Sequence, residues 1–485
     1  MSTFSGINAA QSALQAARAG IDVAGQNMNN LTTEGYTRQR VTLASVAPTG
    51  RIGMLASPTF SAGQGVAVTG IARLANEMLD QKVRSTAASA GFSYVRASTL
   101  SGLEKSLNEP STTGISAQLT DFWSSWQTLS NSPNSDAAAA VVIEEGTTLA
   151  AQIKQGYTAV SSQWDSLRGN ASLQTDELNA AATQVAELNG MIRSALASGT
   201  PTNAMLDQRS MLTSSIATLA GGTVTQNTDG TVDVLLGGNM LVSGTTANAV
   251  TLAGPRSIDG SGAGTGGATA VQLEWASRPG AAIALDGGEL GGAVSMLAPS
   301  TSAGTGASGT GGALASAANS YNAMATALAS KVNSMLAGGV TSSGAAGTPF
   351  FGTTGTGAAA LGLTVIPTKA SDIAVRDPDK GALDGSIADK ISLIGKQADS
   401  PDALWSSTVT SIGATTKTEL KLSVLADLAA TSASANQLAN SSVDLDEENV
   451  NLLMSQQAYN AAARVLTTMD EMLDTLINRT GLVGR

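Results

Sequence analysis

Residues 7–31 read INAAQSALQAARAGIDVAGQNMNNL, and residues 452–476 read LLMSQQAYNAAARVLTTMDEMLDTL. Apolar residues recur at alternating steps of three and four in the first stretch, and every seven residues in the second. This spacing is typical of helices that pack lengthwise against one another. The N-terminal seam consists of Ile7, Ala10, Leu14, Ala17, Ile21, Ala24, Met28 and Leu31. The C-terminal seam consists of Leu452, Tyr459, Leu466 and Leu473, with Ala462, Met469 and Leu476 at the alternate position. The sequence therefore predicts that its two ends pair as a coiled coil.

The two seams have two interpretations, a buried helix pair within one monomer or an interface for assembly. Gly20 and Gly25 lie inside the first helix, and each costs about 1 kcal/mol relative to alanine. An isolated helix of this length is marginal in water. The small alanines of the N-terminal seam also permit close approach of another helix. These features favour assembly somewhat over the monomer interpretation.

Composition excludes several classes of protein. The chain has 485 residues, which is too long for one core and indicates two to four domains. It contains neither Cys nor His, so Cys-based zinc sites, Cys nucleophiles and Ser-His-Asp triads are excluded. A formal net charge of −11 without a basic run argues against nucleic acid as a partner. No stretch has the roughly 20 apolar residues that a membrane span needs.

Helical patterns occupy most of the chain outside its middle. We expect helices at 74–107, 115–129, 206–219, 314–336, 387–395 and 401–441, and one or two helices over 135–197 with an interruption near Gly169. Phe122, Trp123 and Trp126 are predicted to lie in a core. The last helix is expected to open at Asp444, which with Glu447 has the spacing of a capping box.

The middle of the chain has a different pattern. Residues 223–234 alternate around an Asp-Gly turn at 229–230, which predicts a hairpin, and strands are also expected at 241–252 and 270–275. The predicted fold class is a multidomain α plus β protein with paired terminal helices, a helical bundle and an inserted β-rich domain. The predicted domains are 1–40 with 441–485, 41–205 with 365–440, and 206–364, with a helix near 314–336 in the last.

Two motifs have a functional interpretation that we weigh against a structural one. Glycines at 304, 306 and 309 match a dinucleotide fingerprint as a string, but no strand precedes them and no suitable acid follows, so a loop is favoured. The acids at 444–448 could hold calcium but lack the spacing of an EF-hand loop. Capping of the last helix explains them better. We therefore predict no catalytic residue, no cofactor and no metal site, and no enzyme activity.

The terminal motifs resemble those of a known family. Residues 27–41, NMNNLTTEGYTRQRV, are similar to the signature that closes the N-terminal helix of flagellar rod, hook and hook-associated proteins. The family motif positions are Asn27, Asn30, Gly35, Tyr36, Arg38 and Gln39, with Leu445, Glu447 and Glu448 at the other end. The GYTRQ and LDEE forms, and inward segments LDQR at 206–209 and GGELGG at 287–292, resemble hook-associated members most.

This resemblance implies a structural protein where the flagellar hook meets the filament. The expected partners are further copies of itself in a ring or helical assembly, the hook protein, the second hook–filament junction protein and an export chaperone holding the C-terminal region. The resemblance also implies export by the flagellar type III apparatus to the cell exterior without a cleaved signal peptide, and no insertion into membranes. The terminal helices are expected to be the assembly interface.

Two alternatives remain open at this point. A rod or hook subunit shares the terminal signatures. A secreted adhesin or enzyme with helical arms would need a polar cluster in a cleft of the 200–370 region, and the sequence shows none.

Overall fold

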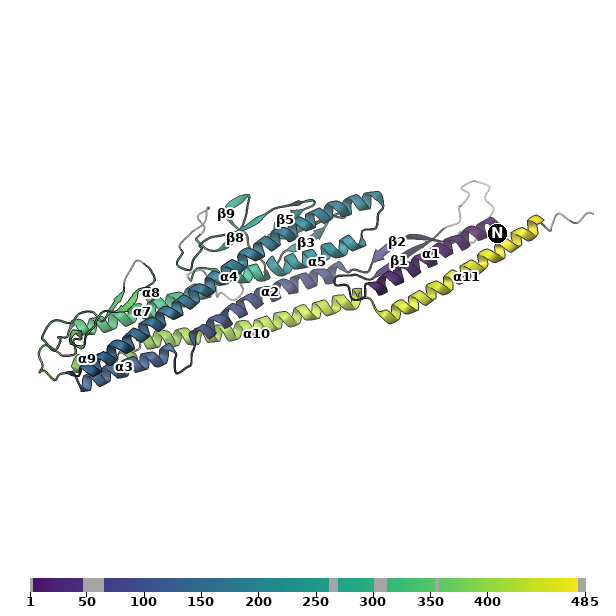
Figure 1. The fold of residues 1–485 in the computed structure, drawn as a ribbon. Coiled ribbons are helices and arrows are strands. Elements are labelled where there is room, and N and C mark those ends of the chain that lie inside the picture. The colour runs from purple at the N-terminus through teal and green to yellow at the C-terminus, as the bar shows by residue number, and fades with distance from the viewer. Residues whose placement is uncertain (1–2, 47–64, 261–268, 301–311, 354–356, 479–485) are drawn as a thin grey trace, which may run out of the picture.

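The computed structural model describes residues 3–46, 65–260, 269–300, 312–353 and 357–478. The chain is elongated (Figure 1), with α1 and α11 side by side at one end and all other helices in a longer body. The glycines at 304, 306 and 309 lie outside the described residues. No helix within the described ranges is long and apolar enough to cross a membrane.

The helices account for most of the described chain. They are α1 (Thr3–Asn29), α2 (Glu77–Leu107), α3 (Ile115–Asn131), α4 (Asp136–Ser198), α5 (Asn203–Ala220), α6 (Gly288–Leu297), α7 (Ala313–Ala337), α8 (Ala359–Gly362), α9 (Ser386–Ser392), α10 (Pro401–Ser441) and α11 (Leu445–Asn478), with 3-10 turns η1 (Ala370–Asp372) and η2 (Ile394–Lys396). The predicted helices over 74–107, 115–129, 206–219, 314–336 and 401–441 are therefore confirmed.

In the described residues the strands form four small antiparallel sheets. They are β1 (Gln39–Ser45), β2 (Val66–Arg73), β3 (Thr223–Gln226), β4 (Val232–Leu236), β5 (Asn239–Ser243), β6 (Thr246–Ala247), β7 (Val250–Ala253), β8 (Gln272–Trp275), β9 (Arg278–Ala282), β10 (Phe351–Thr353) and β11 (Leu363–Val365). Their orders are β1-β2, β3-β4-β5-β6, β7-β8-β9 and β10-β11. Gln226 pairs with Val232 across the predicted Asp-Gly turn, which confirms the hairpin.

The expected interruption near Gly169 is wrong. α4 runs unbroken for 63 residues. A single glycine costs only about 1 kcal/mol in a helix interior, and the helix is held by packing on both sides of it. Trp164 and Ala171 are fully or almost fully buried. Tertiary contacts therefore outweigh the local preference.

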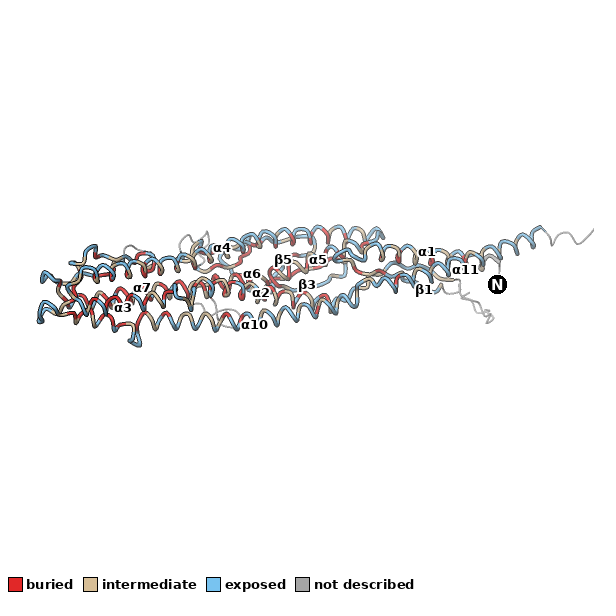
Figure 2. The backbone as a smooth tube through the Cα atoms, turned by 60° about the horizontal axis from the view of Figure 1, so that its bottom comes forward, coloured by how far each residue is buried: buried red, intermediate tan, exposed pale blue. Residues whose placement is uncertain are grey.

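Over the part of the chain that the structure describes, two hydrophobic cores lie along α4. The first packs its N-terminal half with α3, α7, α9 and the start of α10, and it contains Phe122, Trp123 and Trp126 as predicted. The second packs its C-terminal half with α5, α6 and the sheets of β3–β9. Segment 206–364 contributes to both cores, because α7 and the β10–β11 pair contribute to the first and the sheets of β3–β9 to the second. Figure 2 shows the buried residues concentrated in this body, while the α1–α11 end is mostly exposed.

A buried ion pair joins α2 to α10. Arg96 Nη2 donates to Glu419 Oε1 at 2.6 Å, and their side chains are 1% and 4% exposed. Arg96 Nη1 also donates to Ser295 Oγ on α6 at 2.9 Å. The guanidinium thus connects three helices at one level of the body.

Removing one partner of this pair should be costly. Because Glu419→Leu leaves a buried guanidinium without its carboxylate, we expect a loss of about 3–5 kcal/mol in the free energy of unfolding. The double variant Arg96→Met with Glu419→Leu should lose much less, because no charge remains unpaired. Denaturant unfolding followed by tryptophan fluorescence measures both. A single variant no less stable than the double variant contradicts this account.

Candidate functional site: the joint between terminal helices and body

The helices α1 and α11 pack against each other in antiparallel orientation (Figure 1). A methyl group added at Gly6 would lie 2.9 Å from Met469 Cε, and one at Gly20 would lie 2.7 Å from Ser455 Oγ. Near the body, Asn27 Nδ2 donates to Glu448 Oε2 at 3.1 Å. From Gly6 to Gly20 to Asn27 the contacts advance by 14 and then 7 residues along α1. Their partners on α11 recede by the same numbers of residues. The register is therefore constant along the pair.

Small side chains lie where the two helices approach most closely. A side chain at Gly6 or Gly20 would meet the side chain of Met469 or Ser455 on α11, which would have to move. Ala10, Ala17 and Ala24 are buried. Small residues of α1 therefore receive side chains of α11 over much of this contact.

The predicted seam residues lie beside this line of contact. On α1, the half-buried ones are Ile7, Leu14, Ile21 and Met28, while Leu31 lies just beyond the helix and is exposed. On α11, the half-buried ones are Leu452, Leu466, Met469 and Leu473, while Tyr459 and Leu476 are exposed. That these residues form an assembly interface stays a prediction.

Asn27 is the buried centre of the joint. Its Nδ2 donates to the Gln39 carbonyl at 2.9 Å as well as to Glu448. Its Oδ1 accepts from the Tyr36 hydroxyl at 2.8 Å and the Gln39 amide at 3.0 Å. Both donors and both acceptor positions of the side chain are satisfied, which a fully buried amide requires.

Arg38 joins the same site to the start of α11. Its Nε donates to Glu448 Oε1 at 2.7 Å and its Nη1 to Glu447 Oε2 at 2.6 Å. Glu448 is buried, whereas Glu447 is exposed. Burial alone would lower the pKa of Arg38, but the two carboxylates outweigh it and raise that pKa. The Arg38 amide also donates to the Ser441 carbonyl at the end of α10.

We call Asn27, Tyr36, Arg38, Gln39 and Glu448 the joint cluster. All five are family motif positions named from the sequence, and the structure brings them together. Of the four remaining motif residues, Glu447 pairs with Arg38, Asn30 bonds the Gln26 carbonyl and Gly35 adopts a φ of +75°. The fourth, Leu445, is exposed. A positive φ is unfavourable for residues with a side chain, and a Cβ at Gly35 would also collide with the side chain of Met211.

A second layer from the body supports this cluster. Asp207 of α5 accepts from the Thr37 amide at 3.3 Å and forms an ion pair with Arg73 of β2. Asn203 donates to Gln39 Oε1 at 3.0 Å. Sequence reasoning singled out residues 206–209 as a motif but did not connect Asp207 to the terminal signature. An acidic residue near the start of a helix does not by itself specify a partner that is distant in sequence.

The acids at 444–448 serve the start of α11. Asp444 Oδ1 accepts from the amides of Asp446 and Glu447 at 2.9 and 3.2 Å, as an N-cap does. The Glu447 side chain pairs with Arg38. Over the described part of the chain, no group of three acidic side chains is placed to hold a metal ion.

Tyr36 should make stability depend on alkaline pH. Burial, with the charges of Asp207 and Glu448, raises its pKa from 10.0 to about 12. Since the folded protein holds this proton more tightly than the unfolded chain, the resulting stability is complete below pH 10 and lost towards pH 12. Tyr36→Phe should cost about 1 kcal/mol below pH 10 through the lost hydrogen bond to Asn27, and this deficit should shrink above pH 10.

Urea unfolding followed by circular dichroism at pH 9 and pH 11.5 measures this effect. Tyr94→Phe is the matched control, because Tyr94 is 64% exposed. A Tyr36→Phe deficit that stays constant between the two pH values contradicts the assigned pKa.

Comparison with known proteins places these features in a family. Residues 100–351 match the model of the flagellar hook-associated protein FlgK helical domain, and residues 435–479 match that of the flagellar basal body rod FlgEFG protein C-terminal segment. The chain is 28% identical to flagellar hook-associated protein 1 of Bacillus subtilis over the full length of both. It is 29% identical to that of Escherichia coli over 50% of this chain and 43% of the relative.

A solved structure of the flagellar hook junction protein FlgK from Burkholderia pseudomallei matches 56% of this chain and 47% of its own, with a TM-score of 0.48 and 24% identity. The C-terminal match is to a segment named for rod proteins, whereas the longer match is to hook-associated proteins. Because the longer match covers just over half of the 485 residues, the chain belongs to the flagellar hook-associated protein FlgK family and is a structural component of the flagellar hook–filament junction.

Proposed function

We propose that α1 and α11 form an antiparallel coiled coil through which copies of this chain assemble at the junction. Contacts that recur at multiples of seven residues support a heptad arrangement. In this proposal residues 1–40 and 441–485 make the inner domain of the assembly. Residues 41–205 with 365–440 form the next shell, and residues 206–364 face outward.

The observation that carries this proposal is a second apolar stripe on α11. Only Glu448 and Ala462 are buried in this helix of 34 residues. Val450, Met454, Val465 and Met472 are 43–64% exposed, and with Ala461 they follow one another at steps of four and seven. At 100° per residue this stripe lies about 110° around the helix from the line that contacts α1. An apolar stripe of this length in one chain indicates a surface that another chain covers.

The exposed surface of α11 suggests which partners bind the chain before and after assembly. Before assembly, an export chaperone would cover α11, and afterwards neighbouring copies would. The hook protein below and the second hook–filament junction protein above are the further partners we propose. A chain without Cys suits passage through an export channel in the unfolded state. We propose that this export uses no cleaved signal peptide.

Loss of the gene tests the junction role directly. We expect electron microscopy of cells lacking this chain to show hooks without filaments, with flagellin released into the medium. Cells without hooks would instead place the protein in the rod or hook. Normal flagella would overturn the junction role.

Single substitutions test the paired helices. Leu466→Asp or Leu14→Asp should leave a soluble, folded body, because neither residue belongs to the two hydrophobic cores. Incorporation into flagella should fall at least about tenfold, since a carboxylate in an apolar interface costs several kcal/mol. Immunoblots of isolated hook–filament complexes measure it. Thr467→Asp is the matched control, since it adds the same charge at an exposed position of α11. Normal incorporation of both seam variants would overturn the role of the helix pair.

A further inference from the structure

The middle of α10 presents an apolar and basic face to solvent. Val424, Leu425 and Leu428 are 60–64% exposed, and Lys417 and Lys421 are exposed beside them. Helical spacing places these five residues on one side of α10. Glu419 is turned into the body to pair with Arg96, and Asp427 lies about 120° around the helix from Lys421. The centre of the face is therefore positively charged.

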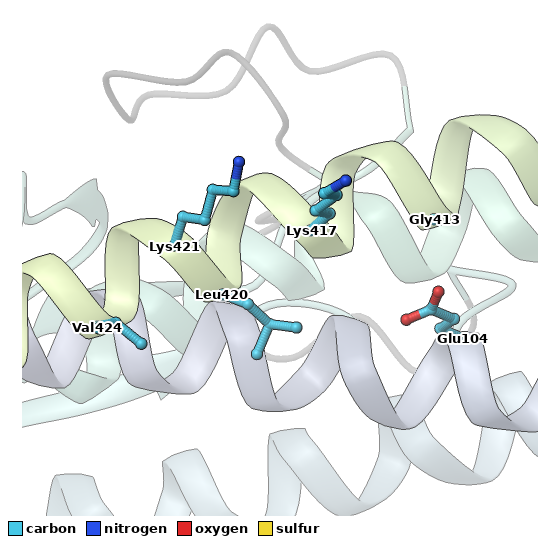
Figure 3. A pocket seen from close by; sticks show the side chains of 6 residues that line it. All are labelled: Glu104, Gly413, Lys417, Leu420, Lys421 and Val424. Carbon is cyan, nitrogen blue, oxygen red and sulfur yellow. The ribbon is translucent and has the colours of Figure 1, made fainter.

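A shallow groove of about 500 Å³ runs along this face between α10 and α2. Figure 3 shows Lys417 and Lys421 pointing away from α2, while Leu420 and Val424 lean towards it. Glu104 of α2 lines the same groove. Leu420 and Val424 thus form the apolar base of the groove, and the ammonium groups of Lys417 and Lys421 lie at its outer side.

The outer face of α4 has the opposite charge. Asp165, Asp176, Glu177 and Glu187 are exposed there, together with Leu173 at 69% and Met191 at 51%. Arg168 is the single cationic residue between positions 165 and 191, and its Nε donates to the Pro255 carbonyl at 2.7 Å. This face is therefore acidic with apolar side chains among the acids.

The two faces lie at the same level on opposite sides of the body. Arg96 of α2 bonds Glu419 of α10, and Gln163 of α4 bonds the Thr99 carbonyl of α2 at 2.7 Å. α2 thus connects this level of α10 to the start of the acidic α4 face. Figure 2 shows α4 and α10 at opposite edges of the body. Copies placed side by side at one level would bring α10 of one against α4 of the next.

We propose that the α10 face of each copy docks on the α4 face of its neighbour in the junction. The contact joins two different surfaces of identical chains, which closes into a ring when the rotation between copies divides a full turn. Lys417 and Lys421 would meet the carboxylates around Leu173, while Val424, Leu425 and Leu428 cover the apolar side chains. This inference rests on the proposed assembly, and it adds a lateral contact that the terminal helices do not supply.

A charge exchange tests the pairing in cells whose only copy is the variant chain. Lys417→Glu with Lys421→Glu sets like charges against each other, so we expect at least about a tenfold loss from isolated hook–filament complexes. Adding Asp165→Lys and Asp176→Lys should restore the amount to within about twofold of the unaltered chain. Lys390→Glu with Lys396→Glu, exposed lysines in and just after α9, is the control with the same change in charge.

Either of two results overturns the proposal: normal incorporation of the lysine variant, or loss without restoration by the exchange. If the lysine variant assembles normally while Leu466→Asp does not, the lateral contact is wrong and the terminal helices keep their role. If both assemble normally, both proposals fail. If the lysines instead bind a chaperone, the variant should be lost from the medium as well as from hooks, and the exchange should not restore it.

Engineered cysteines give a second measurement, because the chain contains none. Oxidation of assembled junctions that carry Leu173→Cys and Leu425→Cys should yield a ladder of linked chains, and neither single variant should. A disulfide requires Cα atoms within about 7 Å. A double variant that assembles at the normal level and gives only monomers overturns the direct contact.

Discussion

The hydrogen-bonded carboxylate of Glu448 fixes how the two ends of the chain meet. Its oxygens accept from Asn27 and Arg38, and the charge is buried. A buried carboxylate is tolerated only while such partners are in place. Moving α11 by even one residue along α1 would separate all of them, so the register of the whole helix pair depends on this end. A single buried polar group sets register in the same way in coiled coils generally.

The rest of the pair adds little stability of its own. Gly6 and Gly20 contact α11 with no side chain, and most of α11 is exposed. Burial of apolar area supplies about 25 cal/mol per Å², so contacts between small residues contribute less than those of a body core. The helices are thus held firmly at the joint and weakly towards their free ends. Such an element gains most from a neighbour that covers the remaining apolar surface, which couples its stability to assembly.

Sequence reasoning found the features that depend on local pattern. The helix predicted at 115–129, its aromatic core and the hairpin predicted at 223–234 follow from periodicity and turn residues, and all five residues of the joint cluster are positions of the family motif. The missed features depend on distant contacts. Gly169 does not interrupt α4, because Trp164 and Ala171 pack on both sides of it. The pairing of Arg38 with Glu447 and of Asp207 with Arg73 joins residues far apart in sequence, and a single sequence does not specify such pairs.

The charge of the chain constrains how copies can meet. With 37 acids against 26 bases, two copies repel each other at distances below the Debye length. A lateral contact therefore needs a local region where the sign reverses. Several bases of the body are already used internally: Arg38, Arg73 and Arg96 each pair with a carboxylate of the same chain. Lys417 and Lys421 are exposed among apolar side chains, at the level where the acidic side of α4 faces outward. These two lysines can attract the acidic face of a second copy locally, although the net charges of the two copies repel.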